Sequence, residues 1–265
     1  MAFDYSNKAV FVAGGTSGIN LGVALKFAAA GANVAVLSRS QEKVDAAVAA
    51  LSEYGGQALG FAADVRDYPA VKKALASAHE QMGNLDILIS GAAGNFPAKA
   101  LGMSPNAFKS VVDIDLLGTY HVLRAAFPFL KRPGASVVNI SAPQAFMPMA
   151  YQMHVCSAKA GVDMITRVGA MEWGKEGVRV NSVVPGPIEG TEGMARLAPT
   201  PESRSKVAGT VPLGRYGTTT DIANCCLWLC SDMASYVSGA IIPVDGGWSL
   251  GGASEMAKTF DSIPG

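Results

Sequence analysis

The sequence predicts an α/β fold, a single doubly wound domain in which helices cover both faces of a mostly parallel sheet. Short apolar runs typical of buried strands alternate along the chain with segments whose apolar residues recur at helical spacing. A glycine-rich turn joins the first strand to the first helix, as in βαβ units. With 265 residues, of which 49% are hydrophobic and 16% charged, the chain can bury one large core, and no linker or repeat divides residues 1–265.

Residues 8–40 form the first βαβ unit. We expect a strand over 8–13, because this run is apolar and β-branched, and a turn over 14–18, where glycines remove side-chain hindrance. A helix follows, with apolar residues at helical spacing at Leu21, Ala24, Leu25 and Ala28. Because the helix N-terminus presents backbone N–H groups and the positive end of the helix dipole, a pyrophosphate can bind there. The natural ligand of this unit is therefore a nucleotide.

Strands and helices alternate through the rest of the chain. Apolar runs predict strands over 57–62, 85–90, 135–141, 178–184 and 240–244. Helical spacing predicts helices over 41–53, 68–82, 105–130, 151–175 and 219–231, the last behind a threonine-rich start. The sheet thus has about seven strands. Ligands of such sheets bind outside the carboxyl ends of the strands, so the chemistry should lie just after residues 13, 38, 62, 90, 141, 184 and 244.

The end of the second strand indicates which dinucleotide binds. Units that bind NAD place an acidic residue about 20 residues past the glycine turn, where it holds the ribose hydroxyl. This chain has Ser38, Arg39 and Ser40 there. A neutral residue followed by arginine suits the 2′-phosphate of NADP, although a solvated loop arginine is the alternative. The turn itself reads G-G-x-x-G, with Asn20 where a further glycine is often found.

Composition excludes several classes of function. The net charge is zero, and neither a basic stripe for nucleic acid nor an apolar run of membrane-spanning length is present in the sequence. The N-terminus lacks the pattern of a signal peptide, so we expect a cytoplasmic protein. Three of the four cysteines, Cys225, Cys226 and Cys230, share one apolar helical stretch without a histidine beside them. We therefore expect core thiols, with no metal site and no disulfide.

Seven short segments carry a resemblance to a known family. They are AGGTSGI (13–19), DV (64–65), SGAAG (90–94), VVNIS (137–141), SAKAGVD (157–163), RVNSVVPGPI (179–188) and VDGG (244–247). Together they resemble the short-chain dehydrogenase/reductase family over nearly the whole chain. The resemblance implies a Rossmann-type NADP-binding domain and a homotetramer. It implies cofactor contacts from Gly14, Thr16, Ser17, Gly18, Ile19, Ser38, Arg39, Ser40, Asp64, Val65, Ala92, Lys159, Pro185, Gly186 and Ile188.

The catalytic residues depart from the usual pattern of that family. Most members carry Tyr-x-x-x-Lys on one helix, where the spacing puts both side chains on one face. Here Lys159 remains, but Val155 occupies the tyrosine position. Asp115 stands for the usual asparagine, and the usual serine falls at or beside Ala142, next to Ser141. Valine cannot donate a proton, so position 155 cannot supply the acid of ordinary carbonyl reduction.

This departure resembles one branch of the family, the 2,4-dienoyl-CoA reductases, and especially the peroxisomal type. The matching segments are AAGNF (92–96), DID (113–115), HVCSAK (154–159) and PGPIEGTEGMARL (185–197). The branch implies hydride transfer from NADPH to the delta carbon of a dienoyl thioester, which forms a dienolate rather than an alkoxide. A tyrosine acid is then dispensable, and an ordered water protonates carbon. The resemblance implies that Asp115 and Asp245 hold that water.

Each candidate acid has an alternative explanation. Asp245 precedes two glycines and can simply accept hydrogen bonds from turn N–H groups. Asp115 lies between apolar residues of a helix that should be largely buried, where a carboxylate needs a partner or a raised pKa. As replacement acids we also consider His154, which is rotated by about 100° from Val155 on the helix, and Ser141 and Tyr151.

Substrate contacts are implied by the branch at two residues. Arg66 can pair with CoA phosphates and Phe96 can line an acyl channel, the alternatives being a surface arginine and a core phenylalanine. Residues 190–209, with Gly190, Gly193, Pro199 and Pro201, predict a mobile substrate flap. The C-terminal SIPG differs from the peroxisomal signal S-K-L, so the resemblance does not extend to the compartment. The tail after Gly251 is expected to cap a neighbouring subunit.

Two other functions fit the same sequence. One is an ordinary NADPH-dependent keto reductase of the 3-oxoacyl type, with His154, Ser141 or Tyr151 as the replacement acid. The other is a non-catalytic NADP-binding sensor or assembly subunit, which the missing tyrosine also permits. Turnover of dienoyl-CoA, turnover of 3-ketoacyl substrates, and cofactor binding without turnover distinguish the three.

Overall fold

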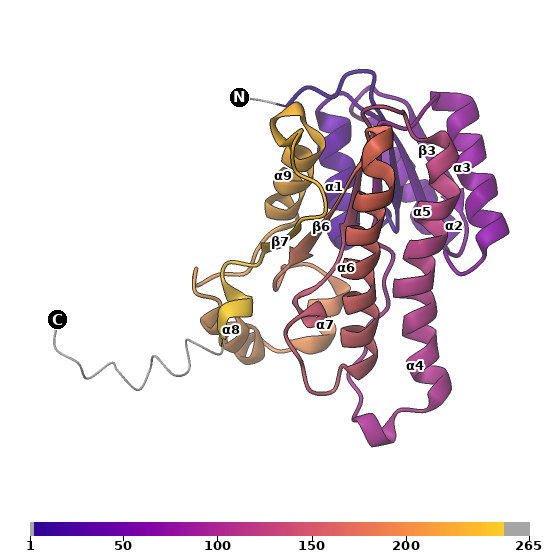
Figure 1. The fold of residues 1–265 in the computed structure, drawn as a ribbon. Coiled ribbons are helices and arrows are strands. Elements are labelled where there is room, and N and C mark those ends of the chain that lie inside the picture. The colour runs from indigo at the N-terminus through magenta and orange to yellow at the C-terminus, as the bar shows by residue number, and fades with distance from the viewer. Residues whose placement is uncertain (1–2, 252–265) are drawn as a thin grey trace.

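The computed structural model describes residues 3–251, which form a seven-stranded sheet with helices on both faces (Figure 1). The strand order is β3-β2-β1-β4-β5-β6-β7, and every neighbouring pair is parallel. The strands are β1 (Ala9–Ala13), β2 (Asn33–Ser38), β3 (Ala58–Ala62), β4 (Ile87–Ser90), β5 (Ser136–Ile140), β6 (Arg179–Pro185) and β7 (Ile241–Val244). The predicted doubly wound α/β class and the number of strands are confirmed.

Six of the helices in residues 3–251 cover the two faces of the sheet, three on each face. The helices are α1 (Gly18–Ala29), α2 (Gln41–Ser52), α3 (Tyr68–Met82), α4 (Pro105–Val111), α5 (Gly118–Ala126), α6 (Met153–Trp173), α7 (Glu192–Leu197), α8 (Pro201–Thr210) and α9 (Thr219–Cys230). Apolar residues of α1, α2 and α9 share one core with one face of the sheet, and those of α3, α5 and α6 share a second core with the other. None of the helices within residues 3–251 is long and apolar enough to cross a membrane.

Strand β1 shows how the sequence produces both cores. Side chains of a strand alternate between the two faces of the sheet, so Val10 and Val12 enter the first core while Phe11 and Ala13 enter the second. All five residues of β1 are buried. A parallel strand covered on both faces is therefore a continuous apolar run, which is the pattern that predicted it.

The predicted helix over 105–130 is interrupted, and the prediction of one regular helix was wrong. Between α4 and α5 the residues Val112–Leu117 form a π-helical segment, and Phe127–Phe129 form a 3-10 turn. Proline at position 128 suits the end of the helix, because it cannot donate the regular backbone hydrogen bond. The π-helical segment contains Asp115, and π-helical turns often occur at functional sites. Apolar spacing alone does not reveal such a turn.

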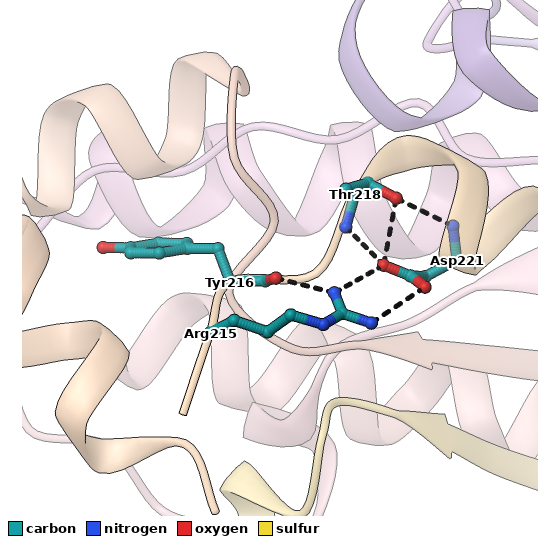
Figure 2. A network of polar contacts seen from close by, with 4 residues as sticks. All are labelled: Arg215, Tyr216, Thr218 and Asp221. Carbon is teal, nitrogen blue, oxygen red and sulfur yellow. Dashed lines mark hydrogen bonds and ion pairs between the residues drawn. The ribbon is translucent and has the colours of Figure 1, made fainter. Parts of the chain in front are cut away.

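The segment from Gly190 to Tyr216, which carries α7 and α8, leaves and rejoins the domain at one point. Gly217 N–H donates to the Pro187 carbonyl, and Glu189 N–H donates to the Gly217 carbonyl, both at 2.9 Å. Figure 2 shows that the Arg215 guanidinium bridges the Asp221 carboxylate and the Tyr216 carbonyl, while Thr218 N–H donates to Asp221 at 2.7 Å. We call these contacts, between residues 187–189 and residues 215–221, the flap neck. The flap neck fixes both ends of the predicted flap, so any motion of the flap would have to arise between residues 190 and 214.

Candidate active site

A cavity of about 1030 Å³ opens at the carboxyl ends of β1 to β6. Its walls are the loops that follow these strands, together with part of α6 and the flap. This is the position expected for the ligand of an open parallel sheet. The cavity is large enough for a dinucleotide and part of a second ligand.

The glycine turn after β1 leaves one wall of the cavity as bare backbone. Gly14 and Gly18 have positive φ angles of 78° and 53°. A Cβ atom on Gly14 would lie 2.8 Å from the backbone of Ala92, so a side chain does not fit between these loops. Asn20, in the position of the missing glycine, donates from Nδ2 to the Gly91 carbonyl at 2.7 Å. The N-terminus of the 12-residue α1 thus faces the cavity with its backbone N–H groups accessible to an anion.

Every residue to which the resemblance assigned a cofactor contact lines this cavity. The set is Gly14, Thr16, Ser17, Gly18, Ile19, Ser38, Arg39, Ser40, Asp64, Val65, Ala92, Lys159, Pro185, Gly186 and Ile188. Lys43, on the first turn of α2, lines the same end as Arg39 and was not predicted. The sequence could have indicated this residue, because Lys43 is a cation only three residues after Ser40. Contact of these residues with a cofactor stays a prediction.

Asp115 and Lys159 both line the cavity, and their side chains meet there. The Asp115 side chain is 1% exposed; its Oδ1 accepts from Gly94 N–H at 2.7 Å and its Oδ2 lies 3.5 Å from Lys159 Nζ. Lys159 Nζ also donates to the Ile140 carbonyl at 3.0 Å. Burial raises the pKa of Asp115, and the Lys159 charge and the Gly94 hydrogen bond oppose that rise only in part. A carboxyl with a raised pKa beside a cation is suited to holding or relaying a proton.

Val155 replaces an acid with an apolar surface. It lies one helical turn before Lys159, lines the cavity, and packs with Val111 and Ala158 in a small apolar cluster. Phe96 packs against the same cluster, and its ring contacts that of His154 at a centroid distance of 4.5 Å. No proton donor therefore occupies the position of the tyrosine.

The three replacement acids are placed differently. Ser141 lines the cavity, and its buried hydroxyl lies near the Asp163 carboxylate. His154 is fully buried outside the cavity lining, and burial lowers its pKa, which disfavours the charged acid. Tyr151 is 56% exposed and also lies outside the lining. Of the three, only Ser141 is in reach of a ligand in the cavity.

The structure places Asp245 in a turn. Its Oδ1 accepts from Gly247 N–H and its Oδ2 from Ser249 N–H, both at 2.9 Å. The residue borders a smaller neighbouring cavity of about 510 Å³ rather than the main one. Because both oxygens are occupied by backbone donors, this geometry fits the turn explanation, and a water-holding role for Asp245 stays a prediction.

The two predicted substrate residues also lie outside the cavity lining. Arg66 is bound to Asp64, with 2.6 Å between Nη2 and Oδ2, and Asp64 itself lines the cavity. Phe96 faces His154 in the apolar cluster. The flap instead contributes apolar side chains to the lining at Met194, Leu197 and Val207. These were expected only as part of the range 190–209.

Sequence reasoning missed two buried polar residues beside the site. Asp163 lies one turn after Lys159 and accepts from the Ser182 hydroxyl at 3.3 Å; burial raises its pKa. Gln144 lines the cavity, and its Nε2 donates to Gln152 Oε1 at 2.9 Å. Asp163 could have been predicted from the sequence, because it is an acid four residues after Lys159 and so lies on the same face of the helix. The second depends on a loop conformation that spacing does not predict.

Comparison with known proteins agrees with this geometry. A family model described as Enoyl-(Acyl carrier protein) reductase matches residues 13–249. The peroxisomal 2,4-dienoyl-CoA reductase [(3E)-enoyl-CoA-producing] of Rattus norvegicus is 44% identical over 244 residues, 91% of this chain and 83% of that protein. The chain belongs to the short-chain dehydrogenase/reductase family, and it is thus an oxidoreductase.

Two solved structures show the same fold. A short chain dehydrogenase from Bacillus anthracis has a TM-score of 0.84 and 37% identity, over 91% of this chain and 96% of that one. Carveol dehydrogenase from Mycobacterium avium, solved in complex with NAD, has a TM-score of 0.88 and 26% identity, over 94% and 99%. The second structure shows that this fold holds a nicotinamide dinucleotide in that protein.

Proposed function

We propose that the protein reduces 2,4-dienoyl-CoA thioesters to enoyl-CoA with NADPH. The single observation that carries the proposal is the buried Asp115–Lys159 pair in a cavity where Val155 stands in place of an acid. This site keeps a cation and a proton-holding carboxyl but has Val155 where a tyrosine would protonate an alkoxide. The name of the rat relative supports the same substrate class.

The walls of the cavity fit a nicotinamide dinucleotide phosphate. The bare backbone at Gly14 and the N-terminus of α1 would hold the pyrophosphate, and Arg39, Ser40 and Lys43 would hold the 2′-phosphate. Asp64 and Val65 would flank the adenine, and Lys159 would hold the nicotinamide ribose. When bound, the reduced cofactor supplies the hydride.

The chemistry of a dienoyl thioester explains the replaced residues. Hydride addition to the delta carbon moves electrons through the conjugated system to the thioester oxygen, which forms a dienolate and no alkoxide. The second hydrogen must arrive as a proton on carbon. Asp115 would hold the water that delivers this proton, and its burial and raised pKa suit that role. The Lys159 ammonium beside it would keep the carboxylate form accessible between turnovers.

The acyl-CoA would enter from the flap side. Met149, Met194, Leu197 and Val207 give that end of the cavity an apolar lining, and methionine adapts to chains of different shape. Arg66 would pair with CoA phosphates after leaving Asp64, and Phe96 would border the acyl chain. Asp245 would help to hold the water only if its turn opens.

A second candidate is the ordinary keto reductase. It is favoured by Ser141, whose buried hydroxyl lines the cavity and could donate to a carbonyl oxygen. The two activities share the cofactor and differ in the carbon that receives hydride.

A spectrophotometric assay of NADPH oxidation separates the candidates. Turnover of 2,4-dienoyl-CoA, with no turnover of 3-ketoacyl-CoA, is the expected result. The reverse pattern would support the keto reductase. Tight NADPH binding without turnover on either substrate would support a non-catalytic subunit.

Compartment and assembly are proposed separately from the reaction. We expect a cytoplasmic homotetramer, whereas the rat relative is named peroxisomal. Fluorescence microscopy of a fusion protein tests the compartment, and light scattering of the purified protein tests the assembly. The expected intersubunit role of the tail falls on residues 252–265, which lie outside the described residues.

A further inference from the structure

The flap helix α7 is tied to both walls of the cavity. On one side, Lys43 Nζ of α2 donates to Glu192 Oε1 at 3.0 Å. On the other side, Arg196 Nη1 donates to the Asn95 carbonyl, in the loop after β4, at 3.1 Å. Thr191 caps α7 by accepting from Met194 N–H. The two ties hold the short helix across the opening, with Met194 and Leu197 lining the cavity.

One of these two contacts involves Lys43, which lies at the end of the cavity proposed to bind the 2′-phosphate. Lys43 and Glu192 both line the cavity, as do Arg39 and Ser40. The Lys43 side chain holds the pKa of Glu192 below its usual range, so Glu192 is ionised near neutral pH. Arg196 lies 3.5 Å from the same carboxylate. The end of the cavity that would take the cofactor phosphate therefore contains an anion fixed on the flap.

We propose that Glu192 is a cofactor-specificity residue that competes with the 2′-phosphate for Lys43. Binding of NADP(H) then transfers Lys43 from the flap to the phosphate and releases one of the two ties on α7. This inference rests on the proposed use of NADPH. In addition, Lys43 would bind either Glu192 of the flap or the 2′-phosphate, so cofactor binding and the position of the flap would be coupled.

The sign of the effect follows from the charges. Without cofactor, the pair with Lys43 stabilises the empty site; with cofactor, the Glu192 carboxylate repels the 2′-phosphate. Both contributions weaken NADPH binding, and neither involves NADH, which has no 2′-phosphate. Because both side chains are about half exposed, each contribution is small, and we expect a combined effect of about three- to tenfold.

The test is the ratio of the Kd of NADH to the Kd of NADPH, measured by cofactor fluorescence without substrate. Glu192→Gln should raise this ratio about three- to tenfold, and the gain should shrink as salt is added. Lys43→Gln should lower the ratio, and Glu192→Gln should have less effect in that background. Glu202→Gln, which removes the same charge from α8 of the same flap, is the matched control and should leave the ratio within about twofold. A general effect of flap opening would change both Kd values equally and leave the ratio constant.

Three outcomes would overturn the inference. A parent protein that favours NADPH, with an unchanged ratio in Glu192→Gln, removes Glu192 from cofactor selection while the proposed function stands. An equal gain in Glu202→Gln shows that only the net charge of the flap matters. A parent protein that binds NADPH and NADH equally contradicts the proposed cofactor, and this inference with it.

Discussion

The turn after β1 and the middle of α6 border the same cavity, but they relate to the fold in different ways. At the turn, Gly14 and the start of α1 offer backbone atoms, whose position is set by the strand and helix themselves. On α6, function depends on side chains, and Val155 replaces the residue type usual in the family without changing the helix. A binding site made of backbone atoms is therefore present wherever the fold forms, whereas the reaction at a site made of side chains can change through one substitution.

Lys159 would serve both the cofactor and the proton transfer, so its loss should have the largest effect. We expect Lys159→Ala to lower turnover by about 10³-fold, because the ribose loses its positioning charge and Asp115 loses its counter-ion. NADPH binding should weaken as well. Steady-state kinetics and a direct binding titration check both effects. Lys175→Ala, just beyond the other end of α6, is the control and should behave like the parent protein. Normal turnover in Lys159→Ala would place this lysine outside the site.

A variant of Asp115 distinguishes cofactor binding from catalysis, because this residue should affect turnover and not the binding of NADPH. We expect Asp115→Ala to lower turnover by about 10²-fold or more while NADPH binding stays nearly intact. Asp115→Asn can still orient a water but cannot relay a proton, so a loss equal to that of alanine supports proton relay. Asp113→Ala is the matched control, since Asp113 is two residues away and pairs with Lys109. A folded Asp115→Ala protein with parental turnover would remove Asp115 from the mechanism.

Arg39 tests the cofactor region without touching the acid-base residues. We expect NADPH to be preferred over NADH by about ten- to hundredfold, the scale of a charge-assisted contact to phosphate. Arg39→Gln should remove most of this preference, mainly by raising the Kd of NADPH. Equal catalytic efficiency of the parent protein with both cofactors would contradict the expectation.

A substitution in the flap neck should have the smallest effect, and it should change the stability of the protein rather than its turnover. The Arg215 guanidinium and the Thr218 N–H hold the pKa of Asp221 well below its usual range. Asp221→Asn should lower the free energy of unfolding by about 1 kcal/mol, through a weaker cap and a partly exposed ion pair. Because the folded-state pKa is depressed, this contribution is complete above the unfolded pKa of about 3.9 and is lost as the pH falls toward the folded-state value. Chemical denaturation at pH 7 and pH 5 should show the same difference between parent and variant. A difference that vanishes at pH 5 would contradict the assignment.

The sequence placed the loops at the strand ends around the cavity, but it did not reveal the buried polar contacts beside Asp115 and Lys159, and the reason is physical. A glycine turn, a strand end and a helix start are local features, so their spacing already determines where Gly14, Ser38 and Pro185 lie. The burial of Asp163 depends on β6 packing against α6, and the π-helical segment around Asp115 depends on tertiary contacts. The tie between Lys43 and Glu192 joins residues 149 positions apart, which no local pattern can predict.

The destination of each added hydrogen tests the central claim most directly. The protein would be supplied with a 2,4-dienoyl-CoA and NADPH deuterated at the transferred position, and the product analysed by NMR. We predict deuterium at the delta carbon and a solvent-derived hydrogen on a second carbon. Protonation at the alpha carbon would give a (3E)-enoyl-CoA, the product in the name of the rat relative. No reaction with the dienoyl thioester, together with deuterium at the carbinol carbon of a reduced 3-ketoacyl-CoA, would contradict the account.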